Sequence, residues 1–466
     1  MYLLLTYNVS AQLHDVAILV HLRGIYESNI SLLSLSGGKV FKPIVEVKGI
    51  KNGELARLIV LKDYLPGEFV LRFDYKEKNT SSPYPSEKNI YINQQDLELW
   101  VNPMFSNKAD STWFQKDETE NAAFVLFSSE NGKQKEKLGL LQNFLLNYDD
   151  QKSKFYKEGI TEYEKRRNNY NVWIANRWQQ DKSLFVSSLY HFQYVPQIPW
   201  EGNETDRMKS LINHYFDGID FNDPQMVKTS QMNKWMDTYV NLNGQLCTTQ
   251  ALRDSLIPAA GKKAIEKARL GHPLVYGWMV DYFYRGFESN NIPAGMKVLE
   301  PYLDDPDCLT TKRLEIEKRL KGMKTLVPGS RAPEIAMNDT EGNKFELSTF
   351  YAGTNYLLLI FWSAGCSHCM EMVEKLYPWQ QQPEIGEKMK VIAINLDETE
   401  PEIKAWEKQL ETLKGWKHLH AADGVRSKVA GDYFVLATPV MVLIDAKAKT
   451  IVSLPDNPEE LKKAIQ

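Results

Sequence analysis

Two cysteines separated by two residues are the part of this sequence best suited to chemistry. They are Cys366 and Cys369, within the stretch FWSAGCSHCMEMVEKLYPW at residues 361–379. Only two other cysteines, Cys247 and Cys308, occur in the 466 residues. Two thiols three positions apart in one helical turn can close a disulfide with little backbone movement. The pair is therefore a redox dithiol, half of a metal site, or a coincidence.

The local pattern places the first cysteine where a helix begins. The apolar run 355–361 predicts a central strand, and a helix is predicted from Cys366 onward. The unpaired backbone N–H groups and positive dipole end of that helix favour a thiolate on Cys366. We predict that Cys366 is the nucleophile and that the more buried Cys369 resolves the mixed disulfide. His368 is predicted to stabilise the Cys366 thiolate, with simple solvent exposure as the alternative.

Strand-like periodicity dominates the first part of the chain. Residues 16–22 form an apolar run, residues 69–76 alternate between apolar and polar, and residues 97–101 repeat that period. Residues 124–127 are predicted as a last strand. A small antiparallel sandwich or sheet follows, which gives a β-rich N-terminal module at residues 13–132.

The apolar period changes to that of helices after residue 132. Helical segments are predicted at residues 138–148, 156–178, 208–215, 231–242, 258–270, 275–287 and 296–302. They predict an all-α middle domain at residues 133–325. Its aromatic stripes, among them Trp278 and Tyr282, are interpreted as core rather than as ligand-binding residues. These first two domains contain no Walker-type, H-E-x-x-H or G-x-S-x-G motif.

Strands and helices alternate from residue 326 to residue 466. Strands are predicted at residues 355–361, 390–396, 440–445 and 450–454, with helices between and after them. This order predicts a C-terminal α/β domain whose sheet contains parallel strands and is covered on both faces. Thr438-Pro439 directly precedes the third strand. A trans bond is the simpler expectation there, whereas a cis bond would leave the backbone before the proline open to an extended substrate.

Residues 326–466 resemble a thioredoxin-fold domain of the TlpA/ResA-like thiol-disulfide oxidoreductases. The motifs that carry the resemblance are G-x-x-A-P at residues 329–333, F-W-S-A-G-C-S-H-C at residues 361–369, and Thr438-Pro439 before a strand. The resemblance implies an enzyme that exchanges disulfides with client proteins and needs no bound cofactor. A partner dithiol protein would donate or accept the electrons. It also implies that Thr438-Pro439 is cis and shapes the client groove, and that Trp362 packs beside the site.

Three positions depart from the pattern of these relatives. Gly365 stands where they usually have tryptophan, and Ile360 stands where cytosolic thioredoxins have a buried aspartate. Met372 stands where many reductases of the group have glutamate. The proton acceptor for Cys369 is therefore not identified; Glu371 lies beside this position and Glu374 lies further on, and Glu371 is the candidate that we consider.

The upstream chain favours a cell-envelope location. Residues 214–240 resemble the helical region of exported Bacteroidetes thioredoxin-like proteins, and the β-rich start resembles their N-terminal module more weakly. Residues 1–12 are predicted as a signal-peptide remnant, with a first buried strand as the alternative. No apolar run is long enough for a membrane span in the mature chain. A net charge of −4 without a clustered basic face gives no reason to expect nucleic-acid binding.

Other functions remain open at this point. A peroxiredoxin-like thiol peroxidase would need a threonine and a proline before the cysteine, where this chain has Ser363 and Leu359. A metal site would need more ligands than His418 and His420, and we expect none. A Cys247–Cys308 disulfide is an alternative to two buried thiols. The last alternative is a non-enzymatic envelope binding protein that carries a thioredoxin-like domain.

Overall fold

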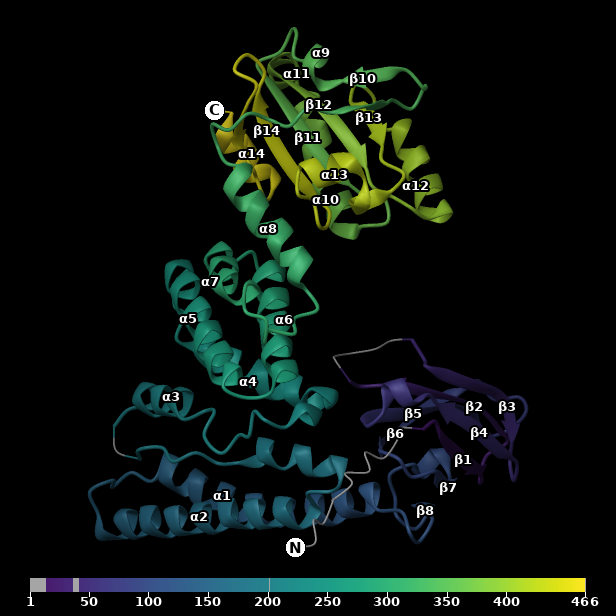
Figure 1. The fold of residues 1–466 in the computed structure, drawn as a ribbon, viewed down its shortest axis with the longest axis vertical. Coiled ribbons are helices and arrows are strands. Elements are labelled where there is room, and N and C mark those ends of the chain that lie inside the picture. Colours follow the sequence, from purple (N-terminus) through teal and green to yellow (C-terminus); the bar gives the residue numbers. More distant parts are fainter. Residues whose placement is uncertain (1–13, 37–41, 201, 466) are drawn as a thin grey trace, which may run out of the picture. The chain divides into compact units, whose positions relative to one another are not determined.

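The computed structural model of the protein describes residues 14–36, 42–200 and 202–465 (Figure 1). Residues 1–12, predicted as a signal-peptide remnant, lie outside the described residues. The chain divides into two compact units between Thr311 and Lys312. Two β-sheets and a helical region make up the first unit, and an α/β domain makes up the second. The predicted fold class is thus confirmed, and the boundaries at residues 132/133 and 325/326 remain our proposal.

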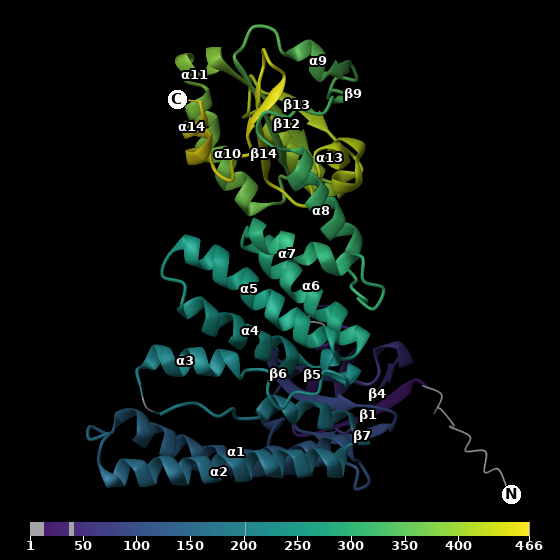
Figure 2. The same cartoon turned by 60° about the vertical axis from the view of Figure 1, so that its left-hand side comes forward.

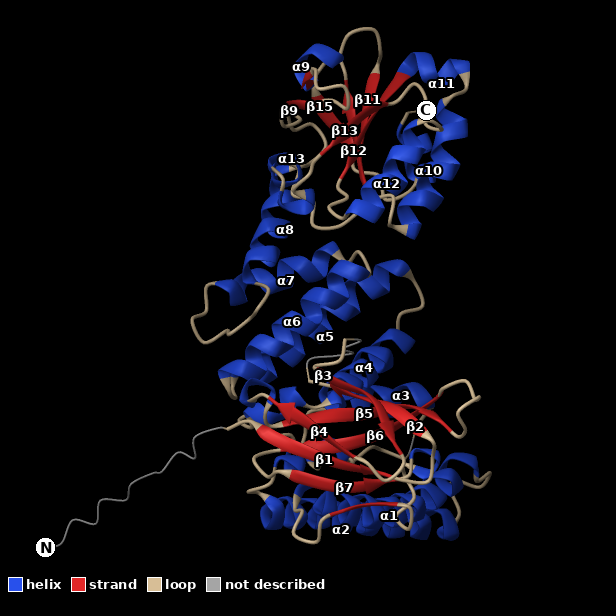
Figure 3. Cartoon of the chain, turned by 90° about the vertical axis from the view of Figure 1, so that its right-hand side faces the viewer, coloured by secondary structure: helices blue, strands red, loops and turns tan. Residues whose placement is uncertain are grey.

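Two four-stranded sheets pack face to face in the first unit (Figure 3). One has the order β4-β1-β7-β8, with bounds Leu55–Val60, Val16–Leu22, Leu97–Val101 and Thr112–Phe114. The other has the order β3-β2-β5-β6, with bounds Val45–Lys51, Glu27–Ser34, Gly67–Lys76 and Tyr84–Ile92. Alternate side chains of both, such as Ile18 and Phe73, share one buried cluster. The predicted sandwich is confirmed, but it is not purely antiparallel, because β1 pairs with β7 in parallel.

Helices α1 to α7 complete the first unit. Their bounds are α1 Glu120–Asn147, α2 Lys154–Asp181, α3 Glu204–Asn213, α4 Ser230–Gln245, α5 Gln250–Arg269, α6 Pro273–Ser289 and α7 Pro293–Leu303. The long antiparallel pair α1 and α2 precedes the shorter helices α4 to α7 (Figure 1). The predicted helical middle is thus present, and α5 begins eight residues earlier than its predicted start at Pro258.

Residues 124–127 belong to α1 and not to a strand, which corrects the sequence prediction. The side chain of Asn121 binds both the N–H and the carbonyl of Tyr91 in β6, each at 2.9 Å. The Glu118 carboxylate accepts the N–H of Asn121 at 2.8 Å, so a first-turn donor of the helix is satisfied. Within this helix, Val125 and Leu126 of the apolar run are 63% and 64% exposed. Anchoring of the helix start to a distant strand therefore overrides the local apolar pattern.

A five-stranded mixed sheet organises the second unit, in the order β13-β12-β11-β14-β15. The bounds are β11 Tyr356–Trp362, β12 Met389–Asn395, β13 Lys417–His420, β14 Val440–Asp445 and β15 Thr450–Ser453. The pairings of β11 with β12 and β12 with β13 are parallel, and those that involve β14 are antiparallel. The remaining elements are α8 Arg313–Thr325, β9 Ala336–Asn338, β10 Lys344–Glu346, α9 Leu347–Phe350, α10 Ser367–Gln380, α11 Pro383–Lys388, α12 Glu400–Leu410, α13 Lys428–Asp432 and α14 Pro458–Ala464.

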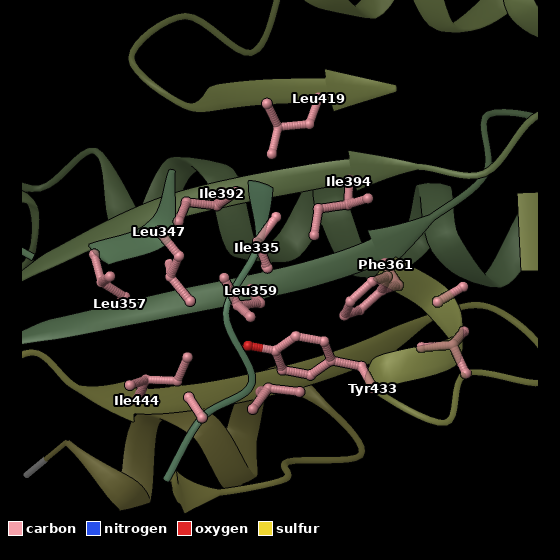
Figure 4. Close-up of a cluster of buried hydrophobic side chains, with 14 of the residues drawn as sticks. Ile335, Leu347, Leu357, Leu359, Phe361, Ile392, Ile394, Leu419, Tyr433 and Ile444 are labelled. Atoms are coloured by element: carbon pink, nitrogen blue, oxygen red, sulfur yellow. The ribbon is translucent and has the colours of Figure 1, made fainter. Parts of the chain in front are cut away.

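Strand β11 is buried on both faces, as a central strand should be. Leu357, Leu359 and Phe361 enter one core, which Figure 4 shows with Tyr433 across from them. The alternate side chains Leu358, Ile360 and Trp362 enter the other core, together with Cys369. Helices α10, α12 and α14 contribute further side chains to that second core, and Figure 2 shows α10 and α14 next to each other. The end of β11 is therefore fixed from both sides where the dithiol loop begins.

Candidate functional site: the dithiol at the end of β11

The loop after β11 delivers Cys366 to the start of helix α10. Cys366 is the N-cap residue of α10, with extended backbone angles. The backbone N–H of Cys369 donates to the Cys366 sulfur at 3.3 Å. An N-cap residue accepts one of the helix N–H groups that have no partner within the helix. The sulfur of Cys366 therefore occupies the place of a capping oxygen, where a negative charge is stabilised by the helix.

The Thr438–Pro439 bond faces this sulfur. The bond is cis, as the family resemblance implies and as the sequence alone did not predict. The thiol of Cys366 donates to the carbonyl oxygen of Thr438 at 3.7 Å. Val440, the first residue of β14, pairs with Phe361 near the end of β11. The antiparallel pairing of these two strands thus brings together two segments that lie 72 residues apart.

Cys369 is fully buried, in contrast to the half-buried Cys366. Burial raises the pKa of the Cys369 thiol, and the nearby sulfur of Cys366 raises it further. The Thr438 hydroxyl and the backbone N–H of Ser363 oppose this rise of the pKa. Cys369 is therefore a neutral thiol at neutral pH and has to lose a proton before it can attack.

A buried carboxylate that the sequence analysis missed holds the loop in front of Cys366. Asp397 is 2% exposed. It accepts hydrogen bonds from the Ser363 hydroxyl, from the Ala364 N–H at 2.9 Å and from the Asn395 side-chain amide at 2.7 Å. The signal in the sequence was its place two residues after the end of the buried strand β12. Because β12 lies parallel and next to β11, the C-terminal ends of both strands meet at one edge of the sheet.

The other predicted residues lie around the dithiol with different exposure. Trp362 is fully buried in the same core as Cys369, so it packs behind the site. His368 is exposed in the first turn of α10. Glu371 is exposed as well, whereas Met372 is buried, so the helix turns Glu371 away from the core that contains Cys369.

The place left open by the absent tryptophan is occupied by an acidic side chain. A Cβ added at Gly365 would lie 3.1 Å from both Cγ and Oε1 of Glu402. Glu402 is held in a capping box with Thr399 at the start of α12. The rim of the site beside Gly365 is thus polar and negatively charged, where these relatives have an aromatic wall.

His418, His420 and Cys247, which the sequence analysis weighed as metal ligands or as a disulfide partner, each bind a backbone carbonyl. His418 and His420 each use Nε2 to bind a backbone carbonyl, of Leu413 at 2.9 Å and of Asp397 at 3.0 Å. Cys247 donates to the carbonyl of Asn243 at 3.4 Å and is not joined to Cys308. The described residues hold no group of three His, Cys, Asp or Glu side chains arranged for a metal ion.

The arrangement described above defines a thioredoxin-like domain with a dithiol at a helix start. Residues 328–453 match the AhpC/TSA family. Over 126 positions the chain is 30% identical to proteins named thiol-disulfide oxidoreductase ResA from Bacillus thuringiensis subsp. konkukian and Bacillus cereus. That match covers 26% of this chain and 66% of each relative, which is just short of two thirds. The predicted resemblance of the C-terminal domain to the TlpA/ResA-like group is thus confirmed.

Solved structures from Bacteroides also align with the chain. A thioredoxin-like protein from Bacteroides caccae has 21% identity and a TM-score of 0.38, and covers 58% of this chain and 96% of its own. The thioredoxin domain of a thiol-disulfide oxidoreductase from Bacteroides vulgatus has 26% identity and a TM-score of 0.26, and covers 30% of this chain and 96% of its own.

The contrast between the two thiols predicts an order of alkylation. With limiting iodoacetamide at pH 7, we expect modification at Cys366 and none at Cys369. A raised pKa means that the thiolate fraction of Cys369 grows about tenfold per pH unit until the pKa is reached, so its modification should rise steeply above pH 8. Peptide mapping by mass spectrometry measures both sites. Equal modification of the two thiols at pH 7 would contradict the burial of Cys369.

Proposed function

We propose that the protein is a thiol-disulfide oxidoreductase that exchanges disulfides with client proteins through Cys366 and Cys369. The observation that carries the proposal is the Cys366 sulfur, which caps α10, is half-buried and lies beside the Thr438 carbonyl. A nucleophilic thiol needs access and a means to stabilise its negative charge, and this position supplies both. Cys369, one turn away and shielded, is placed to attack Cys366 but not a client.

The proposed reaction has two steps. The Cys366 thiolate attacks one sulfur of a client disulfide, the client S–S bond breaks, and a mixed disulfide forms while the other client sulfur leaves as thiolate. Cys369 then loses its proton and attacks the Cys366 sulfur, which releases the second client thiolate. The client gains two electrons and the dithiol becomes a disulfide. A partner dithiol protein returns the electrons, and the reverse sequence would oxidise a client.

The remaining assignments follow the same geometry. The backbone around Thr438 and Pro439 is proposed to pair with an extended client segment, with Trp362 supporting the site from the core. His368 is proposed to stabilise the Cys366 thiolate from the exposed side of the helix.

Export to the periplasm or cell envelope is proposed from the residues at the start of the sequence and from the resemblance to exported relatives. Helices long and apolar enough to cross a membrane are absent from the described part of the chain.

The peroxidase alternative fits the site less well. The Ser363 hydroxyl, which would have to contact peroxide in place of the usual threonine, donates to the buried Asp397 carboxylate. Leu359, at the position of the required proline, is fully buried within β11. We therefore expect consumption of hydrogen peroxide by the protein and a thiol reductant to stay near the rate of the reductant alone.

Redox equilibration of the purified chain in glutathione buffers tests the proposal. We expect one two-electron transition in which a Cys366–Cys369 disulfide forms and breaks reversibly, as mass spectrometry after acid quenching would show. A midpoint below about −200 mV identifies a reductase, and a midpoint near about −120 mV identifies an oxidant. Failure to form this disulfide at any glutathione ratio would exclude both directions of the proposed exchange.

A further inference from the structure

A cavity of about 720 Å³ lies within the helical region of the first unit. Its walls come from α4, from the start of α5 and from the C-terminal half of α6, which are neighbouring helices in Figure 1. Cavities that bind small ligands measure about 300–1,000 Å³. The sequence analysis interpreted Tyr282 as core, but the structure places it in this wall. No assigned function uses this cavity.

Two glycines keep the cavity open. Gly244 in α4 and Gly286 in α6 both line it, and a Cβ added at either would have no heavy atom of the described residues within 4 Å. Gly277, also in α6, differs because its Cβ would lie 2.2 Å from the backbone of Leu309. A helical glycine costs about 0.5–1 kcal/mol relative to alanine. At Gly277, close packing against Leu309 explains why the helix contains a glycine despite this cost. At Gly244 and Gly286 no described part of the chain packs in this way, and the glycine instead leaves the cavity open.

The lining combines apolar surface with hydrogen-bond donors. Apolar side chains form one part of the wall: Val240, Ile257, Phe283, Phe287 and Ile292. The side-chain nitrogen of Asn233 is buried and has no hydrogen-bond partner among the residues that the structure describes. A buried amide without a partner is costly, and a bound acceptor would remove that cost.

The lining contains two arginines, Arg253 and Arg285, and one carboxylate, that of Asp237. Arg285 is exposed at the cavity and has no ion pair among the described residues, whereas Arg253 pairs with Asp254 at 2.8 Å. The single acidic side chain of the lining, Asp237, accepts the Tyr282 hydroxyl at 2.7 Å. Asp237 is thus already engaged as an acceptor, whereas the guanidinium of Arg285 and the amide of Asn233 remain as donors that a ligand could satisfy.

We propose that this cavity binds a carboxylate attached to an apolar body. Arg285 supplies the positive charge, the amide of Asn233 donates to an oxygen of the ligand, and the apolar body covers Phe283 and Phe287. Both a small carboxylic acid and the C-terminal residue of a peptide have this chemistry. The inference is independent of the dithiol, because every lining residue precedes residue 312.

Cys247 lines the cavity and provides the readout. In a full-length chain with Cys366→Ser and Cys369→Ser, the alkylation rate of Cys247 is followed with 3-phenylpropionate or with acetyl-Ala-Ala-Phe as probe. At a probe concentration ten times its Kd, alkylation should slow about 11-fold and saturably. The corresponding amides lack the charge, so the Kd that their protection of Cys247 gives should be at least about tenfold higher than that of the acids. Protection by the acid alone assigns a small-molecule site, and protection by the peptide assigns a C-terminus.

Two variants decide whether the cavity is the site. Gly286→Leu should fill it and abolish binding of the acid, measured by calorimetry so that direct shielding of Cys247 does not interfere. Gly139→Leu in α1, where a Cβ also meets nothing within 4 Å, is the matched control and should bind normally. Arg285→Gln should remove the preference for acid over amide, whereas Lys262→Gln, an exposed residue of α5 outside the lining, should not.

Three results would overturn the proposal. They are the absence of protection by either probe at millimolar concentration, equal protection by acid and amide, and full binding by a Gly286→Leu chain with an unchanged circular dichroism spectrum.

Discussion

Replacement of Cys366 by serine is expected to lower the rate of disulfide exchange by at least about 10³-fold. The thiolate is the attacking group, and a serine hydroxyl stays protonated at neutral pH and forms no disulfide. The hydroxyl can still accept the Cys369 N–H as an N-cap, so α10 should remain folded. Reduction of a small disulfide-bonded client, followed by the absorbance of its released thiols, measures the loss.

The companion replacement Cys369→Ser should have a different consequence. The first attack by Cys366 remains, but the thiol that resolves the intermediate is gone, so a mixed disulfide with the client should accumulate. Non-reducing electrophoresis and mass spectrometry would detect it. Cys247→Ser, a change in the first unit, is the control and should leave exchange unaltered. Undiminished exchange by the Cys366→Ser chain would remove the basis of the proposed activity.

The second large effect is expected at Asp397. Replacement by alanine leaves the Ser363 hydroxyl, the Ala364 N–H and the Asn395 amide without their acceptor in a buried place. Each buried donor without a partner costs about 1–3 kcal/mol. Local relaxation or an entering water molecule offsets part of the total cost of the three donors. We expect the free energy for local opening of β11 to fall by about 2–4 kcal/mol. Hydrogen exchange of residues 356–362 in the full chain measures it.

Matched variants separate the hydrogen bonds of Asp397 from its charge. In Asp397→Asn, the amide oxygen can accept from Ala364 and Asn395 while the amide nitrogen donates to Ser363, so a loss of only about 1 kcal/mol is expected. Asp423→Ala removes an exposed carboxylate from the same region of the chain and should change nothing measurable. Equal hydrogen exchange in Asp397→Ala and the parent protein would show that the loop before Cys366 does not depend on this carboxylate.

The sequence allowed most of the second unit to be predicted. The strands there are short apolar runs between turn residues, and β14 begins and ends at the predicted residues. The first cysteine follows a buried strand after three residues, so its position at a helix start could be inferred from local order alone. The wrong prediction at residues 124–127 arose because a contact distant in sequence, and not the local pattern, decides the structure there. Whether that apolar run is a strand or a helix depends on Asn121 binding Tyr91, a contact that no local pattern reveals.

The same division holds for the candidate site. Cys366, Cys369 and Pro439 could be selected because their residue types and spacing carry chemical meaning by themselves. Asp397 could not, because an aspartate after a strand has no special meaning until β12 is known to lie beside β11. The empty space at Gly286 is likewise invisible in the sequence, where a glycine within a helix reads only as a weak helix former.

The amino-acid sequence by itself determined the dithiol, the alternation of strands and helices in the C-terminal domain, and the resemblance of that domain. These depend on neighbours along the chain, whose spacing fixes the period of burial and the start of a helix. Only the tertiary structure decided which carboxylate holds the loop and where a cavity stays open. Those features depend on residues far apart in the chain, such as Ser363 and Asp397, and on the volume that packed side chains leave between helices.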